Sequence, residues 1–367
     1  MALERGSRQR VDVLCLPLRL TQDDHRLGSR FVTTLDFSSL IALSLSLSYH
    51  ATVAGMVLYF LSIRSMIKHM KKRVAVIGGM NFDINGKIPN IIWKDSNPGI
   101  IRTSIGGVGR NIAENLARLD VSVSLFSFIG DDAFGDAVYQ HTKNAGVVMD
   151  YVERLPHIRT GVYFSLSDDE DMVVALNDTA ATEQMDVPWA TRVLGAIQEH
   201  DMVFLDAGLI KETIDYIAYH CKDKIIMMDS VSVSKARRIV DAIPYCHTLK
   251  PNVYELHELT HLPTETEEQI IKAAATLVAR GCKEVIVTRG SKPLLKITET
   301  ETLSVPVPAS HTVNLTGAGD AFLAAYAAGL LHQATNPLAW AIKASAITIA
   351  SEDTVSPNLS LKAIKGE

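Results

Sequence analysis

The sequence has little cysteine and little proline, and each scarcity excludes classes of protein. Its 367 residues include only 4 Cys and 13 Pro, whereas hydrophobic residues make up 47%. Scarce proline with this hydrophobic share argues against a disordered or collagen-like chain and for a packed globular protein. The cysteines stand far apart and form no C-x-x-C pair: Cys15, Cys221, Cys246 and Cys282. We therefore expect neither a zinc site nor a disulfide framework, and we expect a reducing compartment.

Excess positive charge is also missing. The chain has 36 Lys and Arg against 41 Asp and Glu, which gives a net charge of -5. Without a basic surface to neutralise phosphates, a nucleic-acid partner is disfavoured. The length is more than one small domain needs, so we expect two or three domains or one large α/β domain with additions.

The first 69 residues differ from the rest of the chain. They carry an excess of Lys and Arg, and residues 37–63 contain no Asp, Glu, Lys or Arg over a length that could span a bilayer. Several serines dilute this stretch, which weakens the interpretation as a membrane anchor. The alternative is that residues 1–69 lie outside the functional domain, because Lys71, Lys72 and Arg73 lead directly into an apolar run typical of an α/β domain. We favour this alternative, with a domain at residues 70–367, no membrane association and a cytoplasmic location.

From Val74 onward, short apolar runs alternate with helical patterns. The expected strands are 74–78, 123–129, 202–206, 224–229 and 284–288, and the expected helices are 111–119, 133–145, 210–219, 235–243, 267–280, 318–331 and 337–350. Apolar strands separated by amphipathic helices predict βαβ units around a mostly parallel sheet that is buried on both faces. Two segments, 83–103 and 160–177, look extended without crossover helices, and we expect them to form a small accessory sheet that acts as a lid.

The most informative motif runs from Asn314 to Asp320 and leads into the helix expected at 318–331. Small residues at Gly317, Ala318 and Gly319 leave backbone N–H groups open at a helix N-terminus, which predicts a phosphate cradle. A carboxylate there would repel phosphate unless it takes a proton from the attacking hydroxyl, so Asp320 is a general-base candidate. A helix start with small residues for close packing explains the same residues equally well.

A second glycine cluster, Gly106-Gly107-Val-Gly109-Arg-Asn111, also precedes a helix. Its spacing differs from the dinucleotide fingerprint G-x-G-x-x-G. Close backbone approach to a ligand, together with the Asn111 amide, suits a polyhydroxylated substrate. Capping of the helix by a glycine-rich turn is the alternative.

Three further places carry polar groups at the ends of expected elements. Asn252 and Glu255 share a helix face and offer oxygen ligands for Mg²⁺ or its waters, although helix capping explains this pair too. Asn81 and Asp83 follow the first strand, where open α/β sheets bind ligands. The sequence Thr288-Arg289-Gly290 closes the strand expected at 284–288.

In this order the motifs resemble the ribokinase-like (PfkB) carbohydrate kinase family over about residues 73–360. Gly106–Asn111 is similar to its first signature and Thr316–Asp320 to its second. Within the family the resemblance is strongest to the pseudouridine kinases, and it is carried by the segments Asp95–Gly99, Gly106–Ala113, Ala175–Asp178, His247–Asn252 and Asn314–Asp320.

The resemblance implies a three-layer α/β/α domain with a β-sheet lid, and transfer of the ATP γ-phosphoryl group to the 5′-hydroxyl of pseudouridine. It implies that Asp320 is the base, that Gly317, Ala318 and Gly319 form the anion hole, and that Asn252 and Glu255 organise Mg²⁺ through water. The residues expected on the substrate side are Asn81, Asp83, Gly106, Gly107, Asn111 and Asp178, and those expected on the nucleotide side are Asn252, Thr288, Gly290 and Thr316.

One departure from the family pattern concerns cations. The family commonly has Asp where this chain has Asn314, at a position that helps form a monovalent-cation site in several members, so potassium activation is in doubt. The family's lid often mediates dimers, which makes a homodimer through the lid an expectation here. The alternatives are another ribokinase-like sugar or nucleoside kinase, and a catalytically silent sugar- or nucleotide-binding regulator. Asp320 argues against the regulator, because a binding protein needs no base beside a phosphate cradle.

Overall fold

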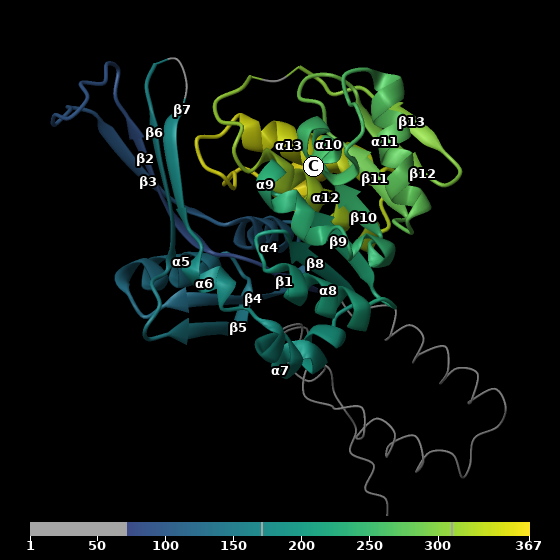
Figure 1. The fold of residues 1–367 in the computed structure, drawn as a ribbon, viewed down its shortest axis with the longest axis horizontal. Helices are drawn as coiled ribbons and strands as arrows, with labels where there is room; N and C mark the ends of the chain where they lie inside the picture. The colour runs from purple at the N-terminus through teal and green to yellow at the C-terminus, as the bar shows by residue number, and fades with distance from the viewer. Residues whose placement is uncertain (1–71, 170–171, 310) are drawn as a thin grey trace, which may run out of the picture. The chain divides into compact units, whose positions relative to one another are not determined.

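The computed structural model of the chain describes residues 72–169, 172–309 and 311–367, which belong to one compact unit (Figure 1). The extension expected at residues 1–69, with its apolar stretch 37–63, lies outside the described residues. Within the described ranges, no helix combines the length and the apolar character needed to cross a bilayer.

A nine-stranded sheet forms the centre of the unit. Its strands, in spatial order, are β13 (Thr302–Val305), β12 (Leu294–Thr298), β11 (Glu284–Val287), β10 (Thr248–Lys250), β9 (Ile225–Asp229), β8 (Met202–Asp206), β1 (Arg73–Ile77), β4 (Ser122–Gly130) and β5 (Val148–Leu155). All neighbouring pairs from β11 to β5 are parallel, whereas β12 and β13 are added antiparallel at one edge. The carboxyl ends of the parallel strands therefore meet at one edge of the sheet.

Helices cover both faces of this sheet, which makes the unit three-layered (Figure 1). Apolar side chains point to both faces of the central strands, and each face has its own hydrophobic core. One core is closed by α7 (Val187–Gln198), α8 (Lys211–His220), α10 (Val253–Thr260) and α11 (Glu267–Ala279), and the other by α4 (Val108–Arg118), α5 (Ala133–Asn144), α12 (Ala318–Leu331), α13 (Pro337–Ile349) and α14 (Leu361–Lys365). The predicted α/β class is confirmed.

Short helices complete the chain. They are α6 (Ala180–Glu183), α9 (Val233–Ala236) and two 3-10 turns at Arg237–Ile239 and Ile243–Tyr245. The continuous helix expected at 235–243 is therefore wrong, because the segment breaks into α9 and 3-10 turns. In contrast, the bounds predicted for β8 and α12 are confirmed.

A separate four-stranded sheet projects from the body next to the carboxyl edge, at the upper left of Figure 1. It consists of β3 (Ile100–Gly106), β2 (Asn81–Lys87), β6 (Gly161–Ser167) and β7 (Met172–Asp178), with β2 and β6 parallel and the other pairs antiparallel. Asp83, Tyr163 and Asn177 pair across three neighbouring strands of this small sheet. Because side chains alternate along a strand, these three share one face.

Candidate active site

A cleft of about 850 Å³ lies where the small sheet meets the carboxyl ends of the central strands. The starts of α4 and α12 also face it. Its wall includes side chains or backbone of most residues that the sequence singles out: Asn81, Asp83, Gly107, Asn111, Asn252, Glu255, Thr288, Thr316, Gly317, Gly319 and Asp320. Motifs that are more than 200 residues apart in the chain, such as Asn111 and Asp320, come within hydrogen-bond distance here.

The N-terminus of α12 is shaped by Gly317. This residue caps the helix in the left-handed region with φ of 81°, and a Cβ on it would come within 1.9 Å of the Thr354 carbonyl oxygen. Only glycine avoids both the strain of a positive φ and the steric overlap with Thr354. The N–H groups of a first helical turn have no partner within the helix, so this end of α12 presents donors and a positive dipole to the cleft.

Asp320 lies in that first turn and is buried. The Asn111 side chain, from α4, donates a hydrogen bond from Nδ2 to Asp320 Oδ2 at 2.7 Å. Burial, with a smaller contribution from the Asp229 carboxylate, raises the pKa of Asp320 to about 8, although Asn111 and Lys250 act in the opposite direction. A carboxyl group with a pKa in this range is a proton acceptor suited to work near neutral pH.

Three charged residues end adjacent strands at the floor of the cleft. Asp206 ends β8, Asp229 ends β9 and Lys250 ends β10. Lys250 Nζ lies 3.1 Å from Asp229 Oδ2, and both residues are buried. A Cβ on Gly319 would lie 3.0 Å from the same Nζ, so this ammonium also borders the first turn of α12.

Sequence reasoning did not single out these three residues as site residues. The signal was present for Asp206 and Asp229, since each ends an apolar run, but not for Lys250, whose strand has only three residues. Neighbouring parallel strands bring their carboxyl ends to one edge, and charged residues at those positions are candidates for a ligand site.

Asp83 faces the cleft from β2 and is buried. Its Oδ1 has no hydrogen-bond partner among the described residues. Burial raises the pKa of Asp83 to about 7, against the Arg110 charge, which lowers it. Gly106 lies directly behind this carboxyl group, because a Cβ there would come within 2.0 Å of Asp83 Oδ2. Gly106 therefore makes room for Asp83, while Gly107 lines the cleft itself.

Asp178 does not face the cleft with these residues. It is exposed, and its Oδ1 accepts a hydrogen bond from the Ala180 backbone N–H at 3.1 Å. The strand alternation explains this, because Asn177 and Thr179 on either side of Asp178 line the cleft. The predicted substrate-binding residue Asp178 is therefore one position away from the residues that line the cleft.

Asn252 and Glu255 form a reciprocal cap at the start of α10. Asn252 Oδ1 accepts from the backbone N–H of Tyr254 and of Glu255 at 2.9 Å each, and Glu255 Oε2 accepts from the Asn252 backbone N–H at 2.9 Å. Glu255 Oε2 also accepts from the Ser230 hydroxyl at 2.6 Å. The capping alternative therefore describes the contacts that these residues make.

The same residues are a sparse donor set for Mg²⁺. Within the described chain, no group of three or more His, Cys, Asp or Glu side chains is arranged to hold a metal ion. Mg²⁺ in phosphate-transfer sites keeps several waters and takes most of its other ligands from the phosphates, so a dedicated protein cage is not required. Glu255 Oε1, which the cap leaves unused, fits a contact to a water of such a hydrated ion.

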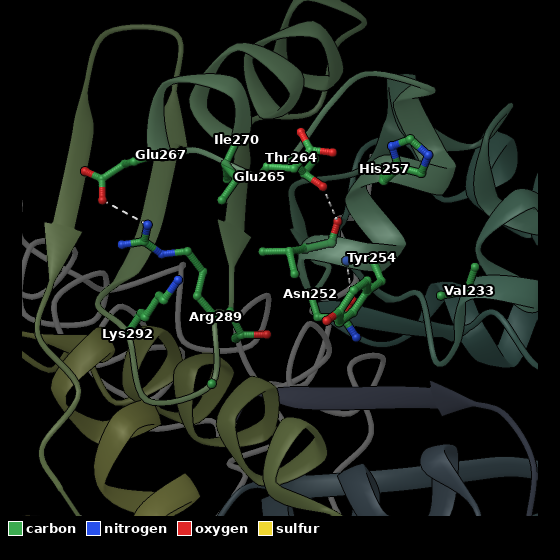
Figure 2. Close-up of a pocket in the computed structure, with 13 residues that line it drawn as sticks. Val233, Asn252, Tyr254, His257, Thr264, Glu265, Glu267, Ile270, Arg289 and Lys292 are labelled. Atoms are coloured by element: carbon green, nitrogen blue, oxygen red, sulfur yellow. Dashed lines mark hydrogen bonds and ion pairs between the residues drawn. The ribbon is translucent and has the colours of Figure 1, made fainter.

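A second pocket of about 1060 Å³ adjoins the cleft and shares Asn252 and Thr288 with it (Figure 2). The predicted nucleotide-side residues Asn252 and Thr288 therefore occur at the junction and Gly290 in this second pocket, whereas Thr316 lines only the cleft. The Thr288 backbone N–H donates to the Pro251 carbonyl at 3.0 Å, which ties the two walls together. Figure 2 shows Arg289 turned toward Glu267 on α11, with which it forms a 2.9 Å ion pair.

Asn314 uses both ends of its amide next to the α12 start. Its Nδ2 donates to the Glu352 carbonyl at 2.9 Å, and its Oδ1 accepts from the Thr316 backbone N–H at 2.9 Å. The uncharged side chain thus joins the segment before α12 to the segment after α13. A carboxylate at this position could not donate the first of these bonds.

Comparisons with known proteins agree with this fold. A family model described as "pfkB family carbohydrate kinase" matches residues 71–360. The chain is 30% identical to pseudouridine kinase of Escherichia coli (strain K12) over 299 residues, which cover 79% of this chain and 95% of that protein. It is 27% identical to ribokinase of Bacillus subtilis (strain 168) over 271 residues, 71% of this chain and 86% of that protein.

Among solved structures, Arabidopsis thaliana ribokinase complexed with ribose and ATP has a TM-score of 0.74 at 23% identity, covering 81% of this chain and 98% of that chain. This likeness supports the fold. Together, the family match over most of the described residues and the full-length curated relatives establish that the chain belongs to the PfkB family of carbohydrate kinases, phosphotransferases with an alcohol group as acceptor.

Proposed function

We propose that this chain is an ATP-dependent kinase that transfers the γ-phosphoryl group to the 5′-hydroxyl of pseudouridine, giving pseudouridine 5′-phosphate. One observation carries the proposal: a buried carboxyl group at a helix N-terminus, Asp320, shares a cleft with the buried carboxyl group of Asp83, whose Oδ1 has no hydrogen-bond partner among the described residues. The identity to the Escherichia coli pseudouridine kinase supports the choice of nucleoside.

In this mechanism Asp320 acts through its second oxygen. Because Asn111 holds Oδ2, Oδ1 is the oxygen that takes the proton of the acceptor hydroxyl as its oxygen bonds to the γ-phosphorus. The bond from that phosphorus to the β–γ bridging oxygen breaks, and ADP leaves. The N–H groups at Gly317, Ala318 and Gly319 stabilise the charge on the transferred phosphoryl oxygens. Glu255 would contact the waters of a bound Mg²⁺ ion, which would supply further charge neutralisation.

The ribose of the acceptor lies against Asp83, Asn81 and Asn111. The free Oδ1 of Asp83 is an acceptor for ribose hydroxyls, and such a pairing would compensate the cost of burying it. These contacts suit any ribosyl compound, so discrimination must come from the base. Pseudouridine has one more ring N–H than uridine, and we propose that Asn177 and Thr179, which line the cleft, supply the acceptor for it.

The nucleotide approaches from the other side of the cleft. Asn252 and Thr288 belong to both the cleft and the second pocket, so the phosphates of a ligand that spans them would lie at this junction. Thr316 and Gly290 flank it, and Lys250 provides positive charge beneath it. A phosphate chain in this position points its terminal group at the α12 N-terminus.

The experiment that tests the activity identifies the product. The protein is incubated with ATP, MgCl₂ and pseudouridine, and phosphorus NMR with proton coupling locates the new phosphomonoester. A signal coupled to the two 5′ protons is expected, and the D320N variant is the control that should give none in the same time. Hydrolysis of ATP without any phosphorylated nucleoside would contradict the proposal.

A broader sugar or nucleoside kinase is the second candidate. The ribose-directed groups Asp83 and Asn111, and the 27% identity to Bacillus subtilis ribokinase, favour it. It would be recognised by a kcat/KM for free ribose or adenosine at least equal to that for pseudouridine.

We also propose that the small sheet carries a homodimer interface on its outer face. Ile101, Val174 and Leu176 are exposed by 75%, 44% and 66%, and the strand register puts them on the face opposite Asp83. Sedimentation velocity at micromolar concentration should give a dimer for the wild type and a monomer for L176K. The L303K variant, at an apolar position on β13 that is 36% exposed, is the control and should stay dimeric. A monomeric wild type would contradict this interface.

A further inference from the structure

Arg110 lies in the first turn of α4 and is only 1% exposed, as is its ion-pair partner Glu114. Its guanidinium is committed on several sides. Nη1 donates to Glu114, whereas Nη2 donates to the Ile105 carbonyl at 2.6 Å and to Asn111 Oδ1. A buried arginine costs free energy unless its charge and its donors find partners, and these contacts supply them for Nη1 and Nη2, whereas Nε has no hydrogen-bond partner among the described residues.

The contact with Asn111 fixes which way that amide points. With Oδ1 held by Arg110, the Nδ2 group is the end that faces Asp320 Oδ2. The reversed amide would put an acceptor oxygen against a carboxylate oxygen and lose both bonds. Arg110 therefore determines that Asn111 donates to the base.

The Arg110 charge also interacts with two carboxylates that line the cleft, Asp83 and Asp320. Attraction by Glu114, Asp83 and Asp320 opposes the lowering of the Arg110 pKa that burial causes, and the same Arg110 charge lowers the pKa of Asp83. One buried cation thus interacts with the proposed base and with the proposed ribose-binding carboxylate.

Glu114 holds Arg110 from behind. Its Oε1 also accepts a hydrogen bond from Arg118 Nη2 at 2.8 Å, and its Oε2 lies 3.3 Å from His141 Nε2 on α5. Arg118 shares this buried carboxylate with Arg110 but contacts neither Asn111 nor Asp320. Arg118 is therefore a natural control, since its loss removes an ion pair to Glu114 and leaves the Asn111 contact in place.

We propose that Arg110 is a positioning residue for phosphoryl transfer: it holds the Asn111 amide in the orientation that donates to Asp320, and its positive charge acts on both Asp320 and Asp83. The inference rests on the proposed function, in which Asp320 is the base. The other charged groups around Asp320 are Asp206, Asp229 and Lys250, on the strands packed against α12. None of these is altered by changes at Arg110.

The test compares R110M, R110K and R118M. For R110M we expect kcat to fall on the order of 10- to 100-fold, with the KM for ATP nearly unchanged, because the nucleotide side is not touched. The acid limb of the kcat/KM profile should move up by roughly one pH unit, since an opposite charge near the base is lost. R110K keeps the positive charge but lacks the paired N–H donors of the guanidinium, so it should lower kcat and leave the acid limb of the kcat/KM profile near its wild-type position. R118M should match the wild type in both readouts.

Two further measurements keep the outcome decisive. If R110M does not fold, the double variant R110M/E114Q removes both buried charges and replaces it in the comparison. Carbon-13 NMR of labelled aspartate, with D320N for assignment, follows the Asp320 pKa without any substrate and should show the same upward shift in the Arg110 variant. If the wild type phosphorylated nothing, the kinase proposal would fail while this titration would still test Arg110. An unshifted Asp320 titration, or equal losses in R110M and R118M with an unmoved acid limb, would overturn the role of Arg110.

Discussion

The catalytic chemistry proposed here depends on one carboxyl group whose surroundings oppose its charge. Asp320 is buried and has Asp229 and Asp206 as negative neighbours, and these conditions raise its pKa to about 8. The Asn111 amide and the Lys250 ammonium stabilise the ionised form. This balance produces a base that ionises near neutral pH and that the fold keeps only at a cost in stability.

Replacing Asp320 with Asn should separate catalysis from binding. The amide keeps the shape of the side chain but cannot take a proton, so kcat should fall by roughly two to four decades, the usual contribution of general-base catalysis. Nucleotide affinity, measured by calorimetry, should change little because Asn252 and Thr288 are untouched. A variant with near-normal kcat would show that another group is the base.

The same variant should be more stable than the wild type, and increasingly so as pH rises. The folded-state pKa of Asp320, about 8, lies above its ordinary value of 3.8, so the folded protein holds this proton more tightly than the unfolded chain. The resulting stability is complete below about pH 4 and is lost as pH rises through 8. In thermal unfolding at a series of pH values, the Tm difference between D320N and the wild type should widen from pH 5 to pH 8.5. A constant difference would argue against a raised pKa.

Asn314 leads to a prediction about monovalent cations. Both ends of its amide already have backbone partners, Glu352 and Thr316, and it brings no charge to a cation site. We expect weak or absent activation by K⁺, and a partial gain of activation in N314D, where a carboxylate oxygen becomes available as a ligand. Initial rates in KCl and in tetramethylammonium chloride at equal ionic strength measure the effect. Strong, saturable K⁺ activation of the wild type would be inconsistent with this expectation.

At the scale of elements, local patterns predicted the parts of the fold that are locally determined. The strand β8 is apolar along its whole length, and α12 follows a run of small residues, so both have clear sequence signals. The three-residue strand β10 and the edge hairpin of β12 and β13 are too short to carry a periodic signal, and tertiary pairing defines them.

The residues of the candidate site are likewise predictable only where local sequence patterns determine them. The helix-start motifs at Asn111, Asn252 and Asp320 are visible in the sequence, because glycines and caps have strong local preferences. Lys250, at the floor of the cleft, is not visible in the sequence, because it joins Asp206 and Asp229 only when β10 pairs with β9. The choice between Asn177 and Asp178 likewise depends on the register of β7 in the small sheet, which one residue of slip reverses.

At the scale of the whole molecule, all residues assigned to the site follow Val74, and the family match begins at residue 71. We therefore propose that residues 1–69 are dispensable for folding and phosphorylation. A protein that begins at Met70 should have a kcat/KM within about twofold of the full chain and a similar Tm, as measured by coupled assay and calorimetry. A shortened protein that fails to fold would show that the extension is part of the functional unit.

The central claim is that the cleft selects pseudouridine for phosphorylation, and the most direct test is a side-by-side kcat/KM panel. Pseudouridine, uridine, adenosine and ribose are assayed by ADP release with the full chain. A pocket that accepts the extra N–H of pseudouridine leaves a polar group unpaired with uridine, at a cost of about 1–3 kcal/mol, so preference for pseudouridine should be roughly 5- to 150-fold. A kcat/KM for ribose or adenosine equal to or above that for pseudouridine would contradict the account and make the protein a broader sugar or nucleoside kinase.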